Sequence, residues 1–376
     1  MLLAKSELLA ELSTQLESLN PGAGAKAAFE LPKVASHGDL ACTSAMQLAK
    51  PLGKNPRALG EQLKESLMSS PAFQKWVSSI EIAGPGFINI TLESASQGSV
   101  IIEILTAGKK YGQGESLAGK KINLEFVSAN PTGPIHLGHT RWAAVGDSLG
   151  RVLSAAGAQV SREFYVNDRG NQMDLFGQSL RAAALGIDRP ENGYHGEYIA
   201  DLANEIIKKN PEFTKLDEES GMVAFREAGY KLQLDLQREV LENFGTHFDT
   251  WFSERSLYEN DFFNHSLDKL KKQGHVYEQE GAIWLRTTDF GDDKDRVMIK
   301  SDGTFAYFAS DSAYYVSKKE RGFNLCIYML GADHHGYVGR VKALAACAGD
   351  DPEKDVEVLI GQMVKIIEDG AELKLS

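Results

Sequence analysis

Residues 122–139 read INLEFVSANPTGPIHLGH, a stretch that passes from a predicted strand through a turn into a predicted helix. The strand is the apolar run from Ile122 to Val127. Two X-Pro pairs then interrupt regular structure, because proline lacks a backbone N–H and restricts the residue before it. From His136 onward, apolar residues recur at intervals of three and four, which predicts a helix. The stretch therefore indicates a strand–turn–helix unit.

Two imidazoles mark the start of this helix. His136 and His139 lie three residues apart, so they share one helix face. Gly138 between them lets a ligand approach the backbone, and the first N–H groups of a helix attract anions. The alternative is that both histidines are ordinary polar helix residues. The preceding strand, the turn and the glycine favour a site for a nucleotide phosphate.

The sequence after residue 115 alternates apolar strands with amphipathic helices. Such alternation predicts an α/β fold in which helices cover both faces of a parallel sheet. The alternation lapses into a largely helical, charged stretch at about 187–295, so we expect an insertion within a Rossmann-type catalytic domain spanning 116–376. Ligands of such sheets bind at the carboxyl ends of the strands, where the strand order reverses. The expected strands are 122–127, 160–166, 297–299, 325–330 and 356–360.

Residues 1–115 predict a separate small α+β domain. Alternating apolar residues at 87–92 follow the turn Gly84-Pro85-Gly86, which indicates a β-hairpin. A glycine-containing segment at 111–114 ends the domain as a flexible linker. One side of the first helix carries four leucines, namely Leu8, Leu12, Leu16 and Leu19.

Composition sets the class of protein. The chain has 376 residues, of which 43% are hydrophobic, and a net charge of −12. No apolar run approaches the roughly 18 residues that a membrane helix needs, and no secretory signal is evident at the start of the sequence. The three cysteines have no CxxC spacing, which predicts a reducing compartment and no protein metal site. We therefore expect a cytoplasmic protein with no membrane partner and no DNA partner.

Other nucleotide and hydrolase motifs are absent or misplaced. The sequence has no GxxxxGK[ST] loop and no convincing GxGxxG. Residues 146–150 read GDSLG and match the GxSxG elbow of hydrolases, but that elbow must lie on a strand-to-helix turn. Here the match falls inside the helix that begins near His136, so we expect it to be due to chance.

A second polar cluster follows the predicted strand at 325–330. It contains Gly331, Asp333, His334 and His335. A carboxylate accepts hydrogen bonds from sugar hydroxyls and an imidazole ring can stack on a base, so the cluster predicts a ribose and adenine pocket. The alternative is that Asp333 caps the following helix. The two roles are compatible.

The residues around the paired histidines resemble a known family. The segment 136–139, HLGH, is similar to the HIGH signature of class I aminoacyl-tRNA synthetases. The longer blocks at 125–134, EFVSANPTGP, and at 164–172, FYVNDRGNQ, resemble the arginyl-tRNA synthetases. The resemblance implies ATP, L-arginine and tRNA(Arg) as substrates, with Mg²⁺ bound through ATP and not at a dedicated protein site. It also implies that His136 and His139 stabilise charge on the reacting phosphate.

Recognition of arginine requires hydrogen-bond acceptors, because the arginine side chain is a planar cation with five N–H donors. The resemblance implies that Tyr307 and Asp311 bind the guanidinium group and that Asn130 holds the α-amino group. The alternative for Asp311 is a carboxylate at a helix N-terminus, which the helix dipole favours. The complete set of expected arginine contacts is Glu125, Ser128, Asn130, His139, Tyr307 and Asp311.

The end of the sequence departs from the family pattern. Class I synthetases carry a second signature, KMSKS, whose lysines hold the triphosphate, and this sequence stops at Lys374-Leu375-Ser376. Lys374 matches the first lysine of that signature. We expect a shortened chain without the anticodon-binding domain, in which residues 1–115 resemble the domain that contacts the tRNA elbow. Two alternatives remain, a non-catalytic tRNA- or arginine-binding paralogue and a small HxGH nucleotidyltransferase.

Overall fold

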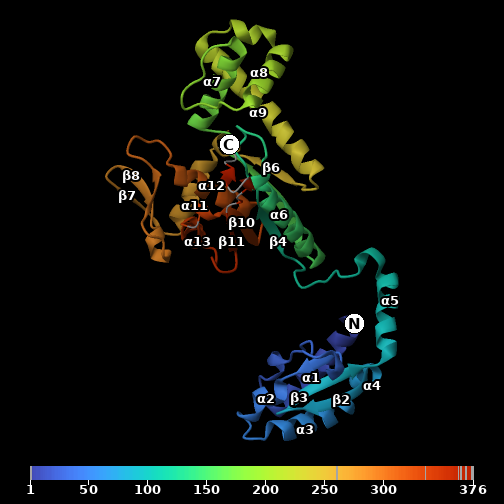
Figure 1. The fold of residues 1–376 in the computed structure, drawn as a ribbon. Helices are drawn as coiled ribbons and strands as arrows, with labels where there is room; N and C mark the ends of the chain where they lie inside the picture. Colours follow the sequence, from blue (N-terminus) through green and yellow to red (C-terminus); the bar gives the residue numbers. More distant parts are fainter. Residues whose placement is uncertain are drawn as a thin grey trace. The chain divides into compact units, whose positions relative to one another are not determined.

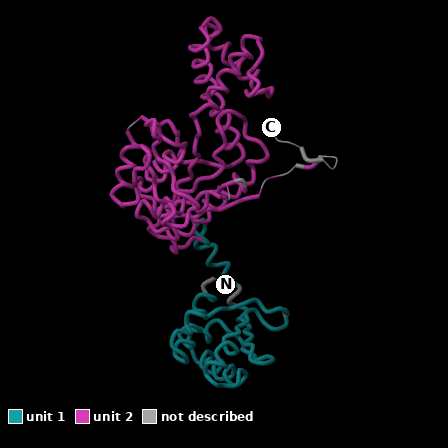
Figure 2. Tube along the Cα trace, turned by 90° about the vertical axis from the view of Figure 1, so that its left-hand side faces the viewer, with its two compact units in different colours: residues 1–112 teal, residues 113–376 magenta. Residues whose placement is uncertain are grey.

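The computed structural model describes residues 2–259, 261–334, 336–362, 364, 366–368 and 371–373. Contacts within the chain divide it into two compact units, Met1–Gly112 and Gln113–Ser376 (Figure 2). Each unit has a hydrophobic core of its own. The boundary falls within the glycine-containing segment at 111–114.

The first unit is a three-stranded antiparallel sheet in the order β1-β3-β2, with helices packed against it (Figure 1). The expected hairpin joins β2 to β3, and Gly84 and Gly86 in its turn have φ values of 50° and 133°, which side-chain-bearing residues rarely adopt. On the predicted leucine face of the first helix, Leu8, Leu12 and Leu16 are buried and Leu19 is partly buried. The elements are α1 (Leu2–Leu19), β1 (Leu40–Cys42), α2 (Ser44–Ala49), α3 (Pro56–Met68), α4 (Pro71–Trp76), β2 (Val77–Ala83), β3 (Phe87–Leu92) and α5 (Ser94–Ala107).

The second unit is built on a five-stranded parallel sheet in the order β11-β10-β4-β5-β6 (Figure 1). Ile122 and Leu124 pack with α6 on one face, whereas Cys326 and Tyr328 pack with α12 and α13 on the other. The predicted α/β class is therefore confirmed. The elements are β4 (Lys121–Glu125), α6 (Leu137–Ala155), β5 (Gln159–Val166), α7 (Asn171–Leu185), β6 (Thr250–Ser253), α12 (Tyr307–Glu320), β10 (Leu325–Gly331), α13 (Tyr337–Cys347) and β11 (Val356–Gly361).

The strand order reverses between β4 and β10. Strands β5 and β6 lie on one side of β4, whereas β10 and β11 lie on its other side. Strand β10 pairs directly with β4, with Tyr328 opposite Glu125. The carboxyl ends of these two strands therefore border the crevice in which parallel sheets bind ligands. The paired histidines follow β4, and the 331–335 cluster follows β10.

The insertion expected at 187–295 is not one continuous segment, because β6 rejoins the parallel sheet within it. Before β6, α7, α8 and α9 form a helical layer around their own core, and after β6 two helices lead to an antiparallel sheet. Strand β6 has four partly buried residues, so it left no apolar run in the sequence. The elements are α8 (Glu197–Lys209), α9 (Glu218–Asn243), α10 (Ser256–Glu259), α11 (Phe262–Lys272), β7 (Val276–Gln279), β8 (Ala282–Leu285) and β9 (Arg296–Ile299), with β12 (Ile366–Glu368) and β13 (Ala371–Leu373) as a hairpin near the end of the chain.

The structure also tests the expectations for residues 297–299 and 146–150. The strand expected at 297–299 was wrongly placed in the parallel sheet, since it belongs to β9, which pairs antiparallel with β8. An apolar run of three residues does not specify its partner strand. Residues 146–150 lie inside α6, as expected, and a Cβ on Gly146 would lie 2.2 Å from the Phe126 ring. The glycine therefore lets α6 pack closely on the sheet.

No described helix is long and apolar enough to cross a membrane.

Candidate functional site

The paired histidines form an interlocked N-terminal cap on α6. His136 is the N-cap residue, and its Nδ1 accepts a hydrogen bond from the Gly138 N–H at 3.0 Å. The His136 N–H donates in turn to His139 Nδ1 at 3.2 Å. The two ring centroids lie 3.9 Å apart. The residue pattern therefore fixes both rings at the start of the helix, beside its free N–H groups.

These contacts also decide which ring nitrogens carry protons. Because Nδ1 accepts in both rings, we infer that each proton lies on Nε2. Burial, with the neighbouring His136 as a second cause, lowers the pKa of His139 to about 4. Burial also lowers the pKa of His136. Both rings are therefore neutral near pH 7, and each has an Nε2–H group that can donate to an anion.

The backbone between β4 and α6 is strained. Val127 and Ser128 have φ values of 66° and 44°. This left-handed conformation costs about 1–3 kcal/mol for each residue and persists only where the surroundings hold it. One restraint is the Tyr165 N–H, which donates to Ser128 Oγ at 3.1 Å. The Ser128 hydroxyl, an expected arginine contact, thus accepts a hydrogen bond that fixes the turn.

Two glutamines of α9 hold the loop that follows. Gln237 Nε2 donates to the carbonyl oxygens of Asn130 at 2.9 Å and of Gly133 at 2.7 Å. Gln233 Nε2 also donates to the Gly133 oxygen, at 3.0 Å. Both glutamines are buried, whereas Asn130 is exposed. These glutamines were not predicted from the sequence, although their four-residue spacing places them on one helix face.

The two predicted guanidinium contacts line one cavity of about 600 Å³. Tyr307 begins α12 and is 96% exposed, so its ring is accessible to a ligand. Asp311 lies one turn further along α12 and is partly buried. The helix was expected to start at Asp311, but it starts four residues earlier. Asp311 therefore lies in the second turn, beyond the main influence of the helix dipole. Other residues that line the cavity include Tyr165, Arg169, Glu254 and Lys300.

Asp311 and Glu254 are two carboxylates that share this cavity. Burial raises the pKa of Asp311 to about 7, although Arg340 and a hydrogen bond with Tyr337 oppose the shift. Burial also raises the pKa of Glu254, against the effect of its hydrogen bond with Tyr165. A bound cation would favour the ionised form of both groups. Glu254 was not predicted, because it follows the short strand β6.

Glu125 lies at the end of β4 in a buried network. Its Oε2 accepts hydrogen bonds from the Tyr314 hydroxyl at 2.9 Å and from Lys318 Nζ at 2.6 Å. The Lys318 side chain is fully buried, with its Nζ 4.2 Å from the centre of the Tyr314 ring and 3.8 Å from that of Tyr328. The charge of Glu125 is therefore balanced within the chain. Its expected contact with arginine stays a prediction.

The cluster after β10 is described only in part. Gly331 ends β10 and is partly buried, and His334 is exposed in the turn that follows. The side chain of Asp333 and all of His335 and Lys374 lie outside the described residues. Their roles stay predictions. Within the described part of the chain, no group of three or more His, Cys, Asp or Glu side chains is arranged as metal ligands.

Comparisons with known proteins bear on both units. Residues 100–375 match the model of the family described as tRNA synthetases class I (R), catalytic domain. Residues 6–92 match the model described as arginyl tRNA synthetase N terminal domain. The chain is 54% identical over 342 residues to the arginine–tRNA ligase of Renibacterium salmoninarum and 50% identical over 344 residues to that of Paenarthrobacter aurescens. These matches cover 91% and 92% of this chain and 62% of each relative, so the chain spans less than two thirds of their length.

Solved structures show the same similarity. A protein from Campylobacter jejuni assigned as an arginyl-tRNA synthetase matches with a TM-score of 0.69 and 38% identity, over 76% of this chain and 63% of the other. The arginyl-tRNA synthetase of Thermus thermophilus matches with a TM-score of 0.69, over 95% of this chain and 65% of the other. At 21% identity, the second match supports the fold alone.

Proposed function

Because this chain belongs to the arginyl-tRNA synthetases of class I, we propose that it provides the site at which L-arginine is activated with ATP and transferred to tRNA(Arg). One observation carries the specificity. Asp311 and Glu254, two carboxylates with raised pKa values, share a cavity with the exposed ring of Tyr307. A small cavity with two such carboxylates suits a ligand that ends in a cation.

The guanidinium group fits this cavity chemically. It is planar, always charged near neutral pH, and offers five N–H donors to carboxylate oxygens. Asp311 would bind it through both oxygens, with Glu254 as a second acceptor, while Asn130 would hold the α-amino group. A neutral side chain of the same shape would not supply the positive charge and the donors that a guanidinium group offers to these carboxylates, and buried polar sites reject analogues in this way.

The activation step places charge on phosphate oxygens. An oxygen of the arginine carboxylate attacks the α-phosphorus of ATP, and the bond from that phosphorus to the bridging oxygen breaks. Pyrophosphate leaves with the bonding electrons, and arginyl-adenylate remains. The Nε2–H groups of His136 and His139 would donate to the phosphate oxygens as neutral imidazoles. Donors that are held in place before the reaction stabilise its transition state without reorganisation.

The remaining contacts follow from the crevice between β4 and β10. Gly138 would approach the phosphates, and Gly331, Asp333, His334 and His335 would contact adenosine. Lys374 would contact the triphosphate, and Mg²⁺ would arrive with ATP, held by phosphate oxygens and water.

In the second step, a terminal ribose hydroxyl of tRNA(Arg) attacks the arginyl carbonyl carbon. AMP leaves with the electrons of the anhydride bond, and the hydroxyl proton is released. The reaction would take place in the cytoplasm, and the first unit would contact the tRNA.

Pyrophosphate exchange tests the proposal directly. It would be measured with L-arginine, with and without tRNA(Arg), on this chain and on a chain extended past Ser376. We expect arginine-dependent exchange in the extended chain. Exchange in the shorter chain would show that residues 1–376 are sufficient for the activation of arginine.

The possible results separate the alternatives. If neither chain catalyses exchange but both bind L-arginine, a binding paralogue is the better description. If exchange requires an acceptor other than an amino acid, the chain is a nucleotidyltransferase of the HxGH type. Either result would contradict the proposed function.

A further inference from the structure

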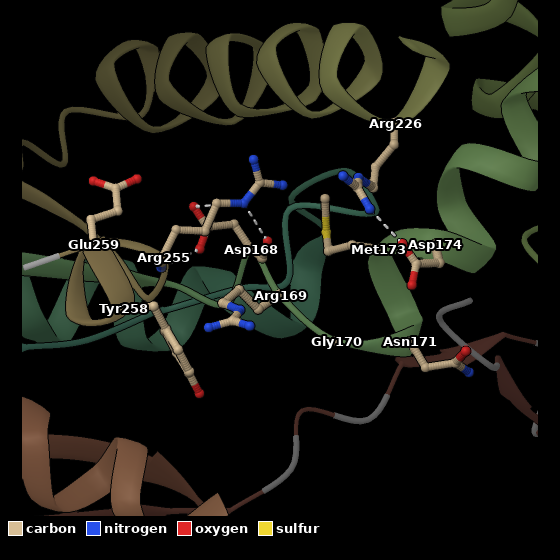
Figure 3. Close-up of a pocket in the computed structure, with 10 residues that line it drawn as sticks. All are labelled: Asp168, Arg169, Gly170, Asn171, Met173, Asp174, Arg226, Arg255, Tyr258 and Glu259. Carbon is tan, nitrogen blue, oxygen red and sulfur yellow. Dashed lines mark hydrogen bonds and ion pairs between the residues drawn. The ribbon is translucent and has the colours of Figure 1, made fainter. Parts of the chain in front are cut away.

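The cavity assigned to arginine has two walls. One wall is formed by the segments that follow β5 and β6, and four of its residues also line an adjoining cavity of about 650 Å³ (Figure 3), namely Arg169, Gly170, Asn171 and Tyr258. The other wall is the start of α12, with Tyr307 and Asp311. The position of α12 on the sheet therefore decides where the predicted guanidinium contacts lie.

Four polar residues share one face of α12, because they are spaced by four, three and four residues. They are Tyr307, Asp311, Tyr314 and Lys318. This face passes from the cavity into the interior, since Tyr307 is exposed whereas Tyr314 and Lys318 are buried. The face that carries the guanidinium contacts thus continues into a buried polar end.

The buried end of this face meets two glutamates that the parallel sheet places side by side. Glu125 of β4 and Glu163 of β5 are register partners, and both are buried. Like charges at opposed positions of a sheet are destabilising. Lys318 Nζ donates to Glu125 Oε2 at 2.6 Å, and Arg321, directly after α12, donates to Glu163 through two N–H groups. The Tyr314 hydroxyl lies 2.9 Å from Glu125 Oε2 and 2.6 Å from Glu163 Oε1.

This network favours one position of α12 on the sheet. Apolar packing is not directional, whereas each glutamate here has its own cation and both share one hydroxyl. A buried ion pair adds little stability compared with apolar side chains, but a fully paired network can select one arrangement. Any other position of the helix would leave a buried charge without its partner, which is costly.

The network is close enough to Asp311 to control the cavity. Lys318 follows Asp311 by seven residues, which corresponds to about 10 Å along a helix. Over that length, a tilt of about 5° would move Asp311 by about 1 Å. A misplacement of about 1 Å can cost about 100-fold in rate. The strand that supplies Glu125 leads to Asn130 and the paired histidines, so the network connects the two ends of the proposed site.

We propose that Lys318 and Tyr314 are positioning residues, which set the distance between the guanidinium contacts on α12 and the groups after β4 that hold the other end of L-arginine. In this role they select the length of the amino-acid side chain. Neither residue lines the arginine cavity, so both act through Glu125 and α12 and not by contact with the substrate. This inference rests on the proposed function and deepens it.

The test compares ligands that contain one end or both ends of the substrate. L-Arginine has both ends, propylguanidine has only the guanidinium end, and L-homoarginine is longer by one methylene group. Dissociation constants would be measured by calorimetry at pH 8. The ratio of the Kd for propylguanidine to the Kd for L-arginine reports the contribution of the second end. A change of charge near Asp311 affects the guanidinium group of both ligands and therefore leaves this ratio unchanged.

Two variants alter the network and one serves as a control. Lys318→Met removes a cation, and Tyr314→Phe removes the shared hydroxyl while both ion pairs remain. Lys319→Met is the matched control, because Lys319 also lies on α12 but pairs with Asp350 at 3.5 Å and Asp355 at 3.4 Å. Circular dichroism would establish that each variant is folded.

We expect the ratio to fall by about 10- to 100-fold in Lys318→Met, because the second end of L-arginine no longer meets its contacts. Tyr314→Phe should lower it by about threefold to tenfold, the effect of one hydrogen bond. The preference for L-arginine over L-homoarginine should fall in the same order. Lys319→Met should keep the wild-type ratio. A purely structural role would lower the stability of the variants but would not change the ratio in folded protein.

The outcomes separate this inference from the proposed function. A wild-type ratio in both Lys318→Met and Tyr314→Phe would overturn the inference, while the proposed function would stand. If Lys318→Met does not fold, Tyr314→Phe alone decides. An equal fall of the ratio in Lys319→Met would assign the effect to any disturbance of α12 and would also overturn the inference. If wild type bound neither L-arginine nor propylguanidine, the proposed function itself would fall.

Discussion

Replacing Asp311 with asparagine tests the specificity of the cavity with the smallest change of shape. The substitution removes one negative charge and keeps a side chain of the same length, which can still form a hydrogen bond with Tyr337. Asp311 lies in the second turn of α12 with a pKa raised to about 7. Its replacement relieves a buried charge, so the fold should be no less stable to heat than wild type.

The expected effect on arginine binding is large. Two unit charges about 4 Å apart interact by about 4 kcal/mol at an effective dielectric constant of 20. Removing one partner of a desolvated, hydrogen-bonded charge pair costs about 2–5 kcal/mol. We therefore expect the Kd for L-arginine to rise by roughly 30- to 5,000-fold at pH 8.

The affinity for L-arginine should also change with pH, in a direction that can be checked. L-arginine binds the ionised form of Asp311, so its affinity should be complete above the pKa of about 7 and should fall as the pH drops below it. The limiting slope is about tenfold per pH unit. Asp311→Asn should show a shallower dependence between pH 6 and pH 8.

Isothermal titration calorimetry with L-arginine at pH 6, 7 and 8 measures both effects. Asp268→Asn is the matched control, because its side chain is 66% exposed on α11, and it should bind arginine as wild type does. If Asp311→Asn bound L-arginine within threefold of wild type at pH 8, the assignment of Asp311 to the guanidinium group would be wrong.

Three further substitutions test the surrounding structure. His136→Ala removes a donor from the proposed phosphate site and should slow pyrophosphate exchange by about 100- to 1,000-fold, with L-arginine affinity by calorimetry unchanged; normal exchange would contradict the role. Lys318→Met leaves Glu125 charged and buried, so urea denaturation should show a loss of about 3–5 kcal/mol in the free energy of unfolding. Adding Glu125→Gln to that variant should restore part of the loss. If the effects of the two substitutions were simply additive, the two side chains would not interact. Gln237→Leu removes two hydrogen bonds to the loop before α6, with an expected loss of about 1–3 kcal/mol in the free energy of unfolding and slower exchange; unchanged exchange would mean that α9 does not position the loop.

The sequence predicted those parts of the fold that have strong local patterns. The strand before the paired histidines and the helix that His136 caps both depend on neighbouring residues, and both are observed. Strand β6 and the pairing of β9 depend on contacts with distant segments. Four partly buried residues at 250–253 carry no periodic signal, and a three-residue apolar run at 297–299 pairs equally well in either kind of sheet.

The candidate site also combines residues that a local pattern predicts with residues that only contacts between distant segments bring together. Tyr307 and Asp311 lie four residues apart on one helix, and both line one cavity. Glu254 reaches that cavity from a different segment, so no local motif revealed it. The ion pair between Glu125 and Lys318 joins residues 193 positions apart in the sequence. Residue types indicated the chemistry of the site, whereas the charge balance within it depends on tertiary packing.

The ratio of affinities for L-arginine and L-citrulline tests the central claim most directly. Citrulline has nearly the same shape, but a neutral urea group replaces the guanidinium group. Calorimetry on this chain at pH 8 should show L-arginine bound at least about 100-fold more tightly, because only the cation pairs with Asp311 and Glu254. Equal affinities would contradict a cavity that selects arginine by its charge.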